Sequence, residues 1–214
     1  MYAHGYSSCA GIGGGFYGDG GTVTIYGGTV EAHGGENGAG IGGGDDGSGG
    51  TVTIYGGTVE AHGGDSAAGI GGGYACDGGT VTIYGGTVEA HGGFNGAGIG
   101  AGYNPTNLNL TPGTLKIDDG VKVYGGDSEN PTTVIATGPK NNVERRYRYM
   151  IAGGHVKGDA NDDLKVNAAD LVEMVNAKNN NASDRFVLKN ADIDGSGNIT
   201  KSDIDGVEKI IMQK

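Results

Sequence analysis

The sequence predicts a mainly β fold, a right-handed parallel β-helix with 29-residue coils, followed by a small all-α domain. Three observations support this prediction. A glycine-rich segment repeats at a fixed period, the repeats alternate polar and apolar residues as half-buried strands do, and the composition shifts near residue 157 to Asp, Asn and helix-forming residues. We expect β-helix repeats over residues 1–126, a β cap or linker over 127–156, and the all-α domain over 157–214.

The repeat begins with the same fourteen residues at Thr22, Thr51 and Thr80, which gives the period of 29 residues. Each copy contains two alternating five-residue segments and a third segment rich in glycine. Three short strands per coil are typical of a parallel β-helix, and glycine pairs supply backbone angles that other residues resist at the corners. The alternative is a disordered glycine-rich linker, in which aligned β-branched residues are not expected.

Stacked coils place equivalent residues in columns, and the apolar columns are predicted to face inward and form the core. These columns contain Val23, Val52, Val81 and Leu115; Ile25, Ile54, Ile83 and Ile117; and Val30, Val59, Val88 and Val121. A degenerate fourth coil over residues 114–124 ends the series. Two strand-like segments, 132–136 and 147–151, flank a polar turn at 139–142 and are expected to cap the open edge.

The polar positions on the same strands are predicted to face solvent. Tyr26, Tyr55 and Tyr84 form one outward column, the candidate glycan-binding face, because tyrosine rings are amphipathic and can hold a sugar chain. The alternative is that stacked tyrosines only shield the sheet and favour strand conformation.

Glutamate and histidine form two further outward columns on a neighbouring strand. Their members are Glu31, Glu60 and Glu89, and His33, His62 and His91, the last column continued by Tyr124. Carboxylate and imidazole groups together could bind a divalent metal. A solvated ladder is the favoured interpretation, because one ligand pair per coil gives no closed cage.

The charge distribution excludes several functions. The net charge is −11, and nine Asp and Glu residues but no Lys or Arg precede Lys116. A surface without fixed cations cannot gather phosphates, which excludes nucleic acid and disfavours anionic membranes. No stretch is long and apolar enough for membrane insertion. The N-terminus lacks signal-peptide features, so we expect a fragment or a processed form of a secreted protein.

We expect no catalysis in the repeats. A β-helical polysaccharide lyase typically uses an Arg or Lys base, and a hydrolase needs two carboxylates in different environments. Near-identical coils provide neither. The alternative is a fragment of a polysaccharide-degrading β-helix enzyme, a lyase or hydrolase, whose catalytic coils lie upstream of Met1.

Two acidic segments follow each other at a spacing of 33 residues. Their oxygen-bearing positions are Asp159, Asn161, Asp163, Lys165, Asn167 and Asp170 in the first, and Asp192, Asp194, Ser196, Asn198, Thr200 and Asp203 in the second. These are positions one, three, five, seven, nine and twelve of an EF-hand loop, where position seven contributes its backbone carbonyl. The pattern predicts two Ca²⁺ sites.

Each loop is expected to start a helix. Asn167 with Asp170, and Thr200 with Asp203, are capping patterns. The apolar faces of the two helices are predicted to contain Leu171, Val172 and Val175 in the first, and Ile204, Val207 and Ile211 in the second. Residues 185–190 can form a short helix that leads into the second loop.

The segments 158–163 and 191–196 make residues 157–214 resemble a type I-like dockerin, the module that docks bacterial extracellular proteins onto cohesin modules of cellulosome-like assemblies. The resemblance implies a cohesin partner, an extracellular location, and partner contacts at loop positions ten and eleven. Those positions hold Ala168 and Ala169 in one copy, and Lys201 and Ser202 in the other. Because the copies differ, we do not expect pseudo-symmetric docking.

The two loops also differ at position six, where a sharp turn with positive φ favours glycine. The second loop has Gly197, but the first has Leu164, whose branched side chain is strained there. We therefore expect the first Ca²⁺ site to be the weaker one.

The glycine-rich repeats resemble the β-helical repeats of bacterial adhesin-like surface proteins. Together the two resemblances imply a non-catalytic, secreted or cell-surface protein of the adhesin-like, carbohydrate-binding kind. Its expected partners are a cohesin and a polysaccharide or host glycan.

Overall fold

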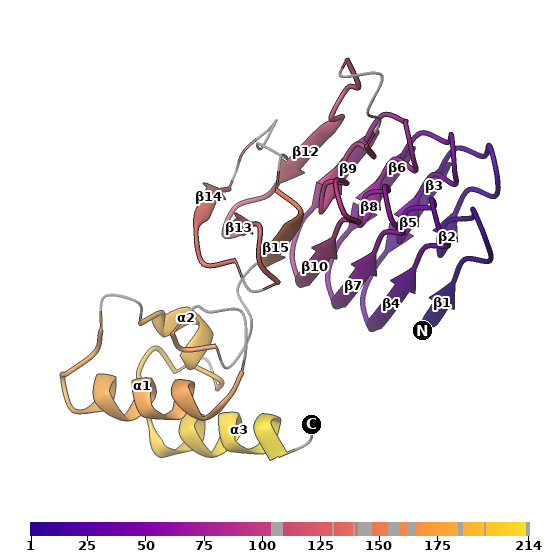
Figure 1. The fold of residues 1–214 in the computed structure, drawn as a ribbon. Coiled ribbons are helices and arrows are strands. Elements are labelled where there is room, and N and C mark those ends of the chain that lie inside the picture. The colour runs from indigo at the N-terminus through magenta and orange to yellow at the C-terminus, as the bar shows by residue number, and fades with distance from the viewer. Residues whose placement is uncertain are drawn as a thin grey trace. The chain divides into compact units, whose positions relative to one another are not determined.

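The repeated segments form strands in the computed structural model, which describes residues 1–103, 109–129, 131–138, 140, 147–153, 159–161, 166–183, 186–194 and 196–212. The chain divides into two units, Met1–Gly154 and His155–Lys214 (Figure 1). In the described residues, all strands belong to the first unit and all helices to the second.

The first unit is a β-solenoid, which confirms the predicted β-helix. Sheet A contains, in spatial order, β1 (Tyr2–His4), β4 (Thr29–His33), β7 (Thr58–His62), β10 (Thr87–His91), β15 (Tyr149–Gly153), β13 (Lys122–Gly126) and β14 (Val134–Thr137). Sheet B contains β2 (Ile12–Gly13), β5 (Ile41–Gly42), β8 (Ile70–Gly71) and β11 (Ile99–Gly100). Sheet C contains β3 (Thr22–Ile25), β6 (Thr51–Ile54), β9 (Thr80–Ile83) and β12 (Thr114–Ile117).

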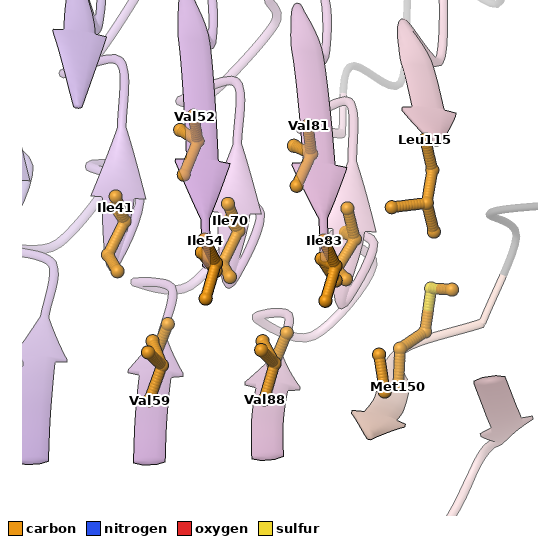
Figure 2. Packing of buried hydrophobic residues seen from close by; sticks show 14 of the residues in the cluster. Ile41, Val52, Ile54, Val59, Ile70, Val81, Ile83, Val88, Leu115 and Met150 are labelled. Atoms are coloured by element: carbon orange, nitrogen blue, oxygen red, sulfur yellow. The ribbon is translucent and has the colours of Figure 1, made fainter. Parts of the chain in front are cut away.

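Equivalent residues of successive coils pair in parallel register, as the period predicts. Val52 pairs with Val23 and Val81, and Val81 pairs in turn with Leu115. The isoleucine column of sheet C, from Ile25 to Ile117, is continuous in the same way. These side chains point into the solenoid together with the isoleucines of sheet B (Figure 2). A single continuous apolar core therefore holds the coils together.

The valine column of sheet A ends one coil earlier than predicted. Val30, Val59 and Val88 stack as expected, but the neighbour of Val88 is Ala152 of β15, not Val121. The histidine column was likewise predicted to continue with Tyr124, which is wrong. His91 pairs with Tyr149, and Tyr124 pairs with Ile151. The reason is that β15 inserts antiparallel between β10 and β13 and covers the edge that an added parallel coil would have used.

Glycine sets the distance between coils along sheet B. Gly71 has a φ of 141°, and a Cβ built on it would overlap the backbone carbonyl of Gly100 in the next coil. Gly42 meets Gly71 in the same way, with a φ of 140°. The backbones approach too closely for any other residue, which explains why the third segment of each coil has so few side chains.

The second unit contains α1 (Ala168–Lys178), α2 (Leu188–Ala191) and α3 (Lys201–Met212). Its core contains Ala160, Val166, Met174, Ala191 and Val207, with Leu171, Ile204 and Ile211 packed against it. The predicted face of α3 is therefore confirmed. The predicted face of α1 is wrong in part, because Val172 is 60% and Val175 43% exposed. Met174 lies in the core instead, since it shares a helix face with Leu171 and Asp170.

The substitution Gly71→Ala is expected to lower the free energy of unfolding by about 2–4 kcal/mol, because it combines an unfavourable φ with a backbone overlap. Gly15→Ala is the matched control, since a Cβ there meets no atom within 4 Å, and it should change stability by less than about 0.5 kcal/mol. Chemical denaturation of both variants checks the prediction. Equal stability of the two variants would show that coil spacing does not depend on this glycine.

Candidate functional site

The second acidic loop brings three carboxylates together. One oxygen from each of Asp192, Asp194 and Asp203 lies within 4.8 Å of the others. Asp203 comes from the first turn of α3 and is buried, while the other two precede the loop turn. These are predicted positions one, three and twelve, so residues eleven apart in the sequence converge on one point.

Hydrogen bonds hold the Asp203 carboxylate in place. The backbone N–H of Asp194 donates to its Oδ1 at 3.1 Å, and the N–H and hydroxyl of Thr200 both donate to its Oδ2 at 2.8 Å. Burial alone would raise the pKa of this carboxyl, but the hydrogen bonds from Thr200 and Asp194 outweigh it and the pKa lies below its ordinary value. The group is therefore ionised at neutral pH, as a cation ligand must be.

The turn of the loop positions the remaining predicted ligands. Gly197, at position six, has a φ of 82°, and its N–H donates to Asp192 Oδ2 at 2.7 Å. The hydroxyl of Ser196 donates to the carbonyl of Asn198 at 3.1 Å, which places positions five and seven side by side. The predicted metal-ligating atoms of this loop are all oxygens, and three of the ligands are carboxylates. This set suits Ca²⁺, which prefers oxygen ligands in flexible loops.

The first loop repeats this framework where the structure describes it. Asp170, at position twelve, accepts the N–H of Asn161 at 3.2 Å and of Asn167 at 2.7 Å, as Asp203 does in the second loop. Asn167 and Asp170 form a complete capping box at the start of α1, which confirms that prediction. Asp159 is buried. The predicted ligands Asp163 and Lys165, and the position-six residue Leu164, lie outside the described residues.

The candidate cohesin-contact residues lie at the exposed starts of the two helices. Ala168 and Ala169 begin α1, and Lys201 and Ser202 begin α3. All four are exposed, but their chemical surroundings differ. The α1 surface continues with the exposed Val172 and Val175, which the sequence analysis had assigned to the core.

The corresponding surface of α3 is charged. Lys201 Nζ lies 2.6 Å from Asp205 Oδ2, and the exposed Glu208 and Lys209 follow on the same helix. The difference between the two helices was visible in the sequence. Its bearing on partner contacts became clear only once the structure had shown which positions of each helix face outward.

The tyrosine column faces outward, as predicted. The Tyr26 and Tyr55 ring centroids are 5.2 Å apart and those of Tyr55 and Tyr84 are 4.9 Å apart, both with an interplanar angle of 4°. The rings therefore stack on one another along the solenoid. The two faces of Tyr55 are turned toward its neighbours, and ring edges and hydroxyls are the groups directed to solvent.

In β4 and β7, glutamate and histidine pair within the strand rather than between strands. His33 Nε2 lies 2.9 Å from Glu31 Oε1, and His62 Nε2 lies 2.8 Å from Glu60 Oε1. The two imidazoles stack at 4.5 Å with an interplanar angle of 1°. Among the described residues, the only group of three acidic, histidine or cysteine side chains close enough to share a metal is the one in the second loop.

Comparison with known families supports both parts of the chain. Residues 157–212 match the model of the dockerin type I domain, and residues 23–45, 52–74 and 81–103 match the Beta helix repeat model. No curated protein and no solved structure gave a match to this chain. None of the helices in the described part of the chain has both the length and the apolar character needed to cross a membrane.

Dockerin type I domains bind calcium and dock onto cohesin modules, while β-helix repeats occur in surface and polysaccharide-related proteins. The chain thus combines β-helix repeats with a C-terminal segment that matches the dockerin type I domain, and a dockerin implies anchoring by cohesin in a cellulosome-type assembly.

Proposed function

We propose that this is a non-catalytic extracellular protein that presents an adhesin-like, carbohydrate-binding surface from a cohesin-bearing assembly. In this proposal residues 1–126 provide the surface, 127–156 close the solenoid, and 157–214 dock in a calcium-dependent manner. The observation that carries the proposal is the oxygen cluster of the second loop directly before α3. That cluster links cation binding to the exposed residues at the helix start.

The absence of Lys and Arg before Lys116 favours binding over catalysis, since the repeats lack the Arg or Lys base that a β-helical polysaccharide lyase typically uses. The Glu–His pairs are alike in β4 and β7. Two carboxylates with different roles, which a hydrolase requires, are therefore not set apart by their surroundings in these coils.

Calcium binding is expected to occur at two unequal sites. Position six takes a positive φ in the second loop, at Gly197. A leucine forced into such a conformation costs about 1–2 kcal/mol, so the first site should be roughly 5- to 30-fold weaker. Calorimetric titration of the calcium-free chain should resolve two affinities, and Leu164→Gly should bring them together. Two equally tight sites in the unmodified chain would contradict the proposal.

Docking is proposed to use α1 rather than α3. Ala168, Ala169 and Val172 are exposed and uncharged, so a partner can cover them without desolvating an ion. Covering the Lys201–Asp205 ion pair would carry that cost.

The substitution Ala169→Arg is therefore expected to weaken binding to cohesin by at least about tenfold, because it introduces a charge into an apolar contact. Ser202→Arg is the matched control, since it changes the same loop position in the second copy and should leave the affinity nearly unchanged. Surface plasmon resonance against a panel of cohesin modules, with and without calcium, measures both. Loss of binding in Ser202→Arg alone would assign docking to α3.

The tyrosine column is proposed as a glycan-binding face that acts through its hydroxyls and ring edges. Tyr55→Ala should reduce binding several-fold on a glycan array, because it removes the middle of three stacked rings. Thr53→Ala, in strand β6 two residues before Tyr55, is the control and should have little effect. Tyr55→Phe separates the contribution of the hydroxyl from that of the ring. Unchanged binding in Tyr55→Ala would leave shielding of the sheet as the role of the column.

A further inference from the structure

The Glu–His ladder of sheet A changes at β10. The ring of His91 is turned by 65° from that of His62, at a centroid distance of 4.6 Å, whereas the preceding pair of imidazoles is parallel. Its Nε2 is buried and has no hydrogen-bond partner among the described residues. An unpaired buried nitrogen is unfavourable, so the end of the ladder differs from the repeats in chemistry as well as geometry.

The cause of this change is strand β15. It lies antiparallel to β10 and pairs His91 with Tyr149, whose ring meets the imidazole edge-on at 5.3 Å. Arg148 directly precedes this strand. Its Nε donates to the carbonyl of Gly92 at 3.1 Å, and its Cζ lies 5.1 Å from the centre of the Tyr149 ring. A guanidinium from outside the cation-free repeats is thereby fixed at the end of the ladder.

A pocket of about 450 Å³ opens at this place. Its functional side chains are Glu60, His91, Phe94, Glu129, Arg148 and Tyr149. The rest of the lining is formed by His62, Asp65 and the glycine pairs at the corners of two coils, residues 63–64 and 92–93, so backbone groups are also open to a ligand. The volume falls within the range of roughly 300–1,000 Å³ that is usual for small-ligand sites.

The lining combines hydrogen-bond donors with acceptors. Carboxylates at Glu60, Asp65 and Glu129 accept, the Arg148 guanidinium donates, and a neutral imidazole can do either. Burial, and then the nearby His62, lower the pKa of His91, which keeps its ring neutral at neutral pH. Carboxylates outnumber the single guanidinium, which disfavours an anionic ligand. A ligand with many hydroxyl groups satisfies this mixture.

Phe94 adds an apolar platform that the other coils lack. Its side chain is 76% exposed, and its backbone N–H donates to the carbonyl of Asp65, whose own N–H donates to Glu36. Glu36, Asp65 and Phe94 therefore occupy one column, in which Phe94 is aromatic, whereas Asp65, which also lines the pocket, is an acid. An exposed ring can pack against the C–H face of a sugar.

We propose that this pocket, formed where β15 joins β10, binds a neutral saccharide unit between the Phe94 ring and the Arg148, His91 and carboxylate groups. The site is separate from the tyrosine column. This inference rests on the proposed function in one respect, the choice of a carbohydrate as the class of ligand.

The test replaces Phe94 by the residue found in the preceding coil. Phe94→Asp is compatible with the fold, because Asp65 occupies the same column. Phe16→Asp is the matched control, since Phe16 is also an exposed phenylalanine in a coil corner and its counterpart one period later is Asp45. Binding of neutral oligosaccharides by the full chain, on an array and then by calorimetry, should fall roughly tenfold or more in Phe94→Asp and persist in Phe16→Asp.

A second pair of variants tests the polar side of the pocket. Glu129→Gln removes a charged acceptor from an exposed turn and should weaken the same saccharide several-fold. Asp127→Asn changes an exposed carboxylate of that turn that does not line the pocket, and should have no effect.

The outcomes separate this proposal from the proposed function. Loss of binding in Tyr55→Ala with full binding in Phe94→Asp would overturn the pocket and leave the carbohydrate-binding function standing. Binding of acidic saccharides alone would overturn the ligand class of the pocket. Failure of the unmodified chain to bind any saccharide would overturn both proposals.

Discussion

The close approach of successive coils is the constraint on which the rest of the solenoid depends. Backbone N–H groups donate to carbonyls of the neighbouring coil along the repeats, as Gly40 does to Ala68 and Ile70 to Gly98. Such bonds fix the coil spacing at the distance between paired strands. At several corners and at the glycine positions of sheet B this distance leaves no room for a Cβ, so glycine is required there.

The same constraint determines the surface. Because every coil repeats at hydrogen-bonding distance, outward residues stack on copies of themselves, and their chemistry is shared along a column. The tyrosine rings cover each other's faces, and His33 and His62 are hydrogen-bonded to the glutamates of their own strands. A regular ladder is thus chemically uniform, and its side chains are largely occupied by contacts with one another. Distinct binding chemistry arises where the repetition is broken, as β15 breaks it beside His91.

The parts of the structure that follow from local periodicity were predictable from the sequence, and the parts that depend on distant pairing were not. The valine and isoleucine columns and the ligand positions of the second loop could be assigned because spacing alone defines them. The error at Val121 and Tyr124 arose because β15, about thirty residues further along the chain, competes for the edge of β10. On α1, Val172 and Val175 were apolar but exposed, because Met174 and Leu171 already fill the core of a small domain.

In the dockerin loops, the same carboxylate belongs to the cation cluster and to the start of the following helix. Asp203 is both a carboxylate of the cluster and the acceptor for the N–H of Thr200 at the start of α3, and Asp170 accepts the N–H of Asn167 at the start of α1. A cation drawn to these carboxylates therefore orders the turn from which the helix starts. Positions ten and eleven lie directly on that turn, so their exposure to a partner depends on the loop below them. In the proposed docking through α1, calcium would control docking without touching the partner, because it would fix the backbone that presents Ala168 and Ala169.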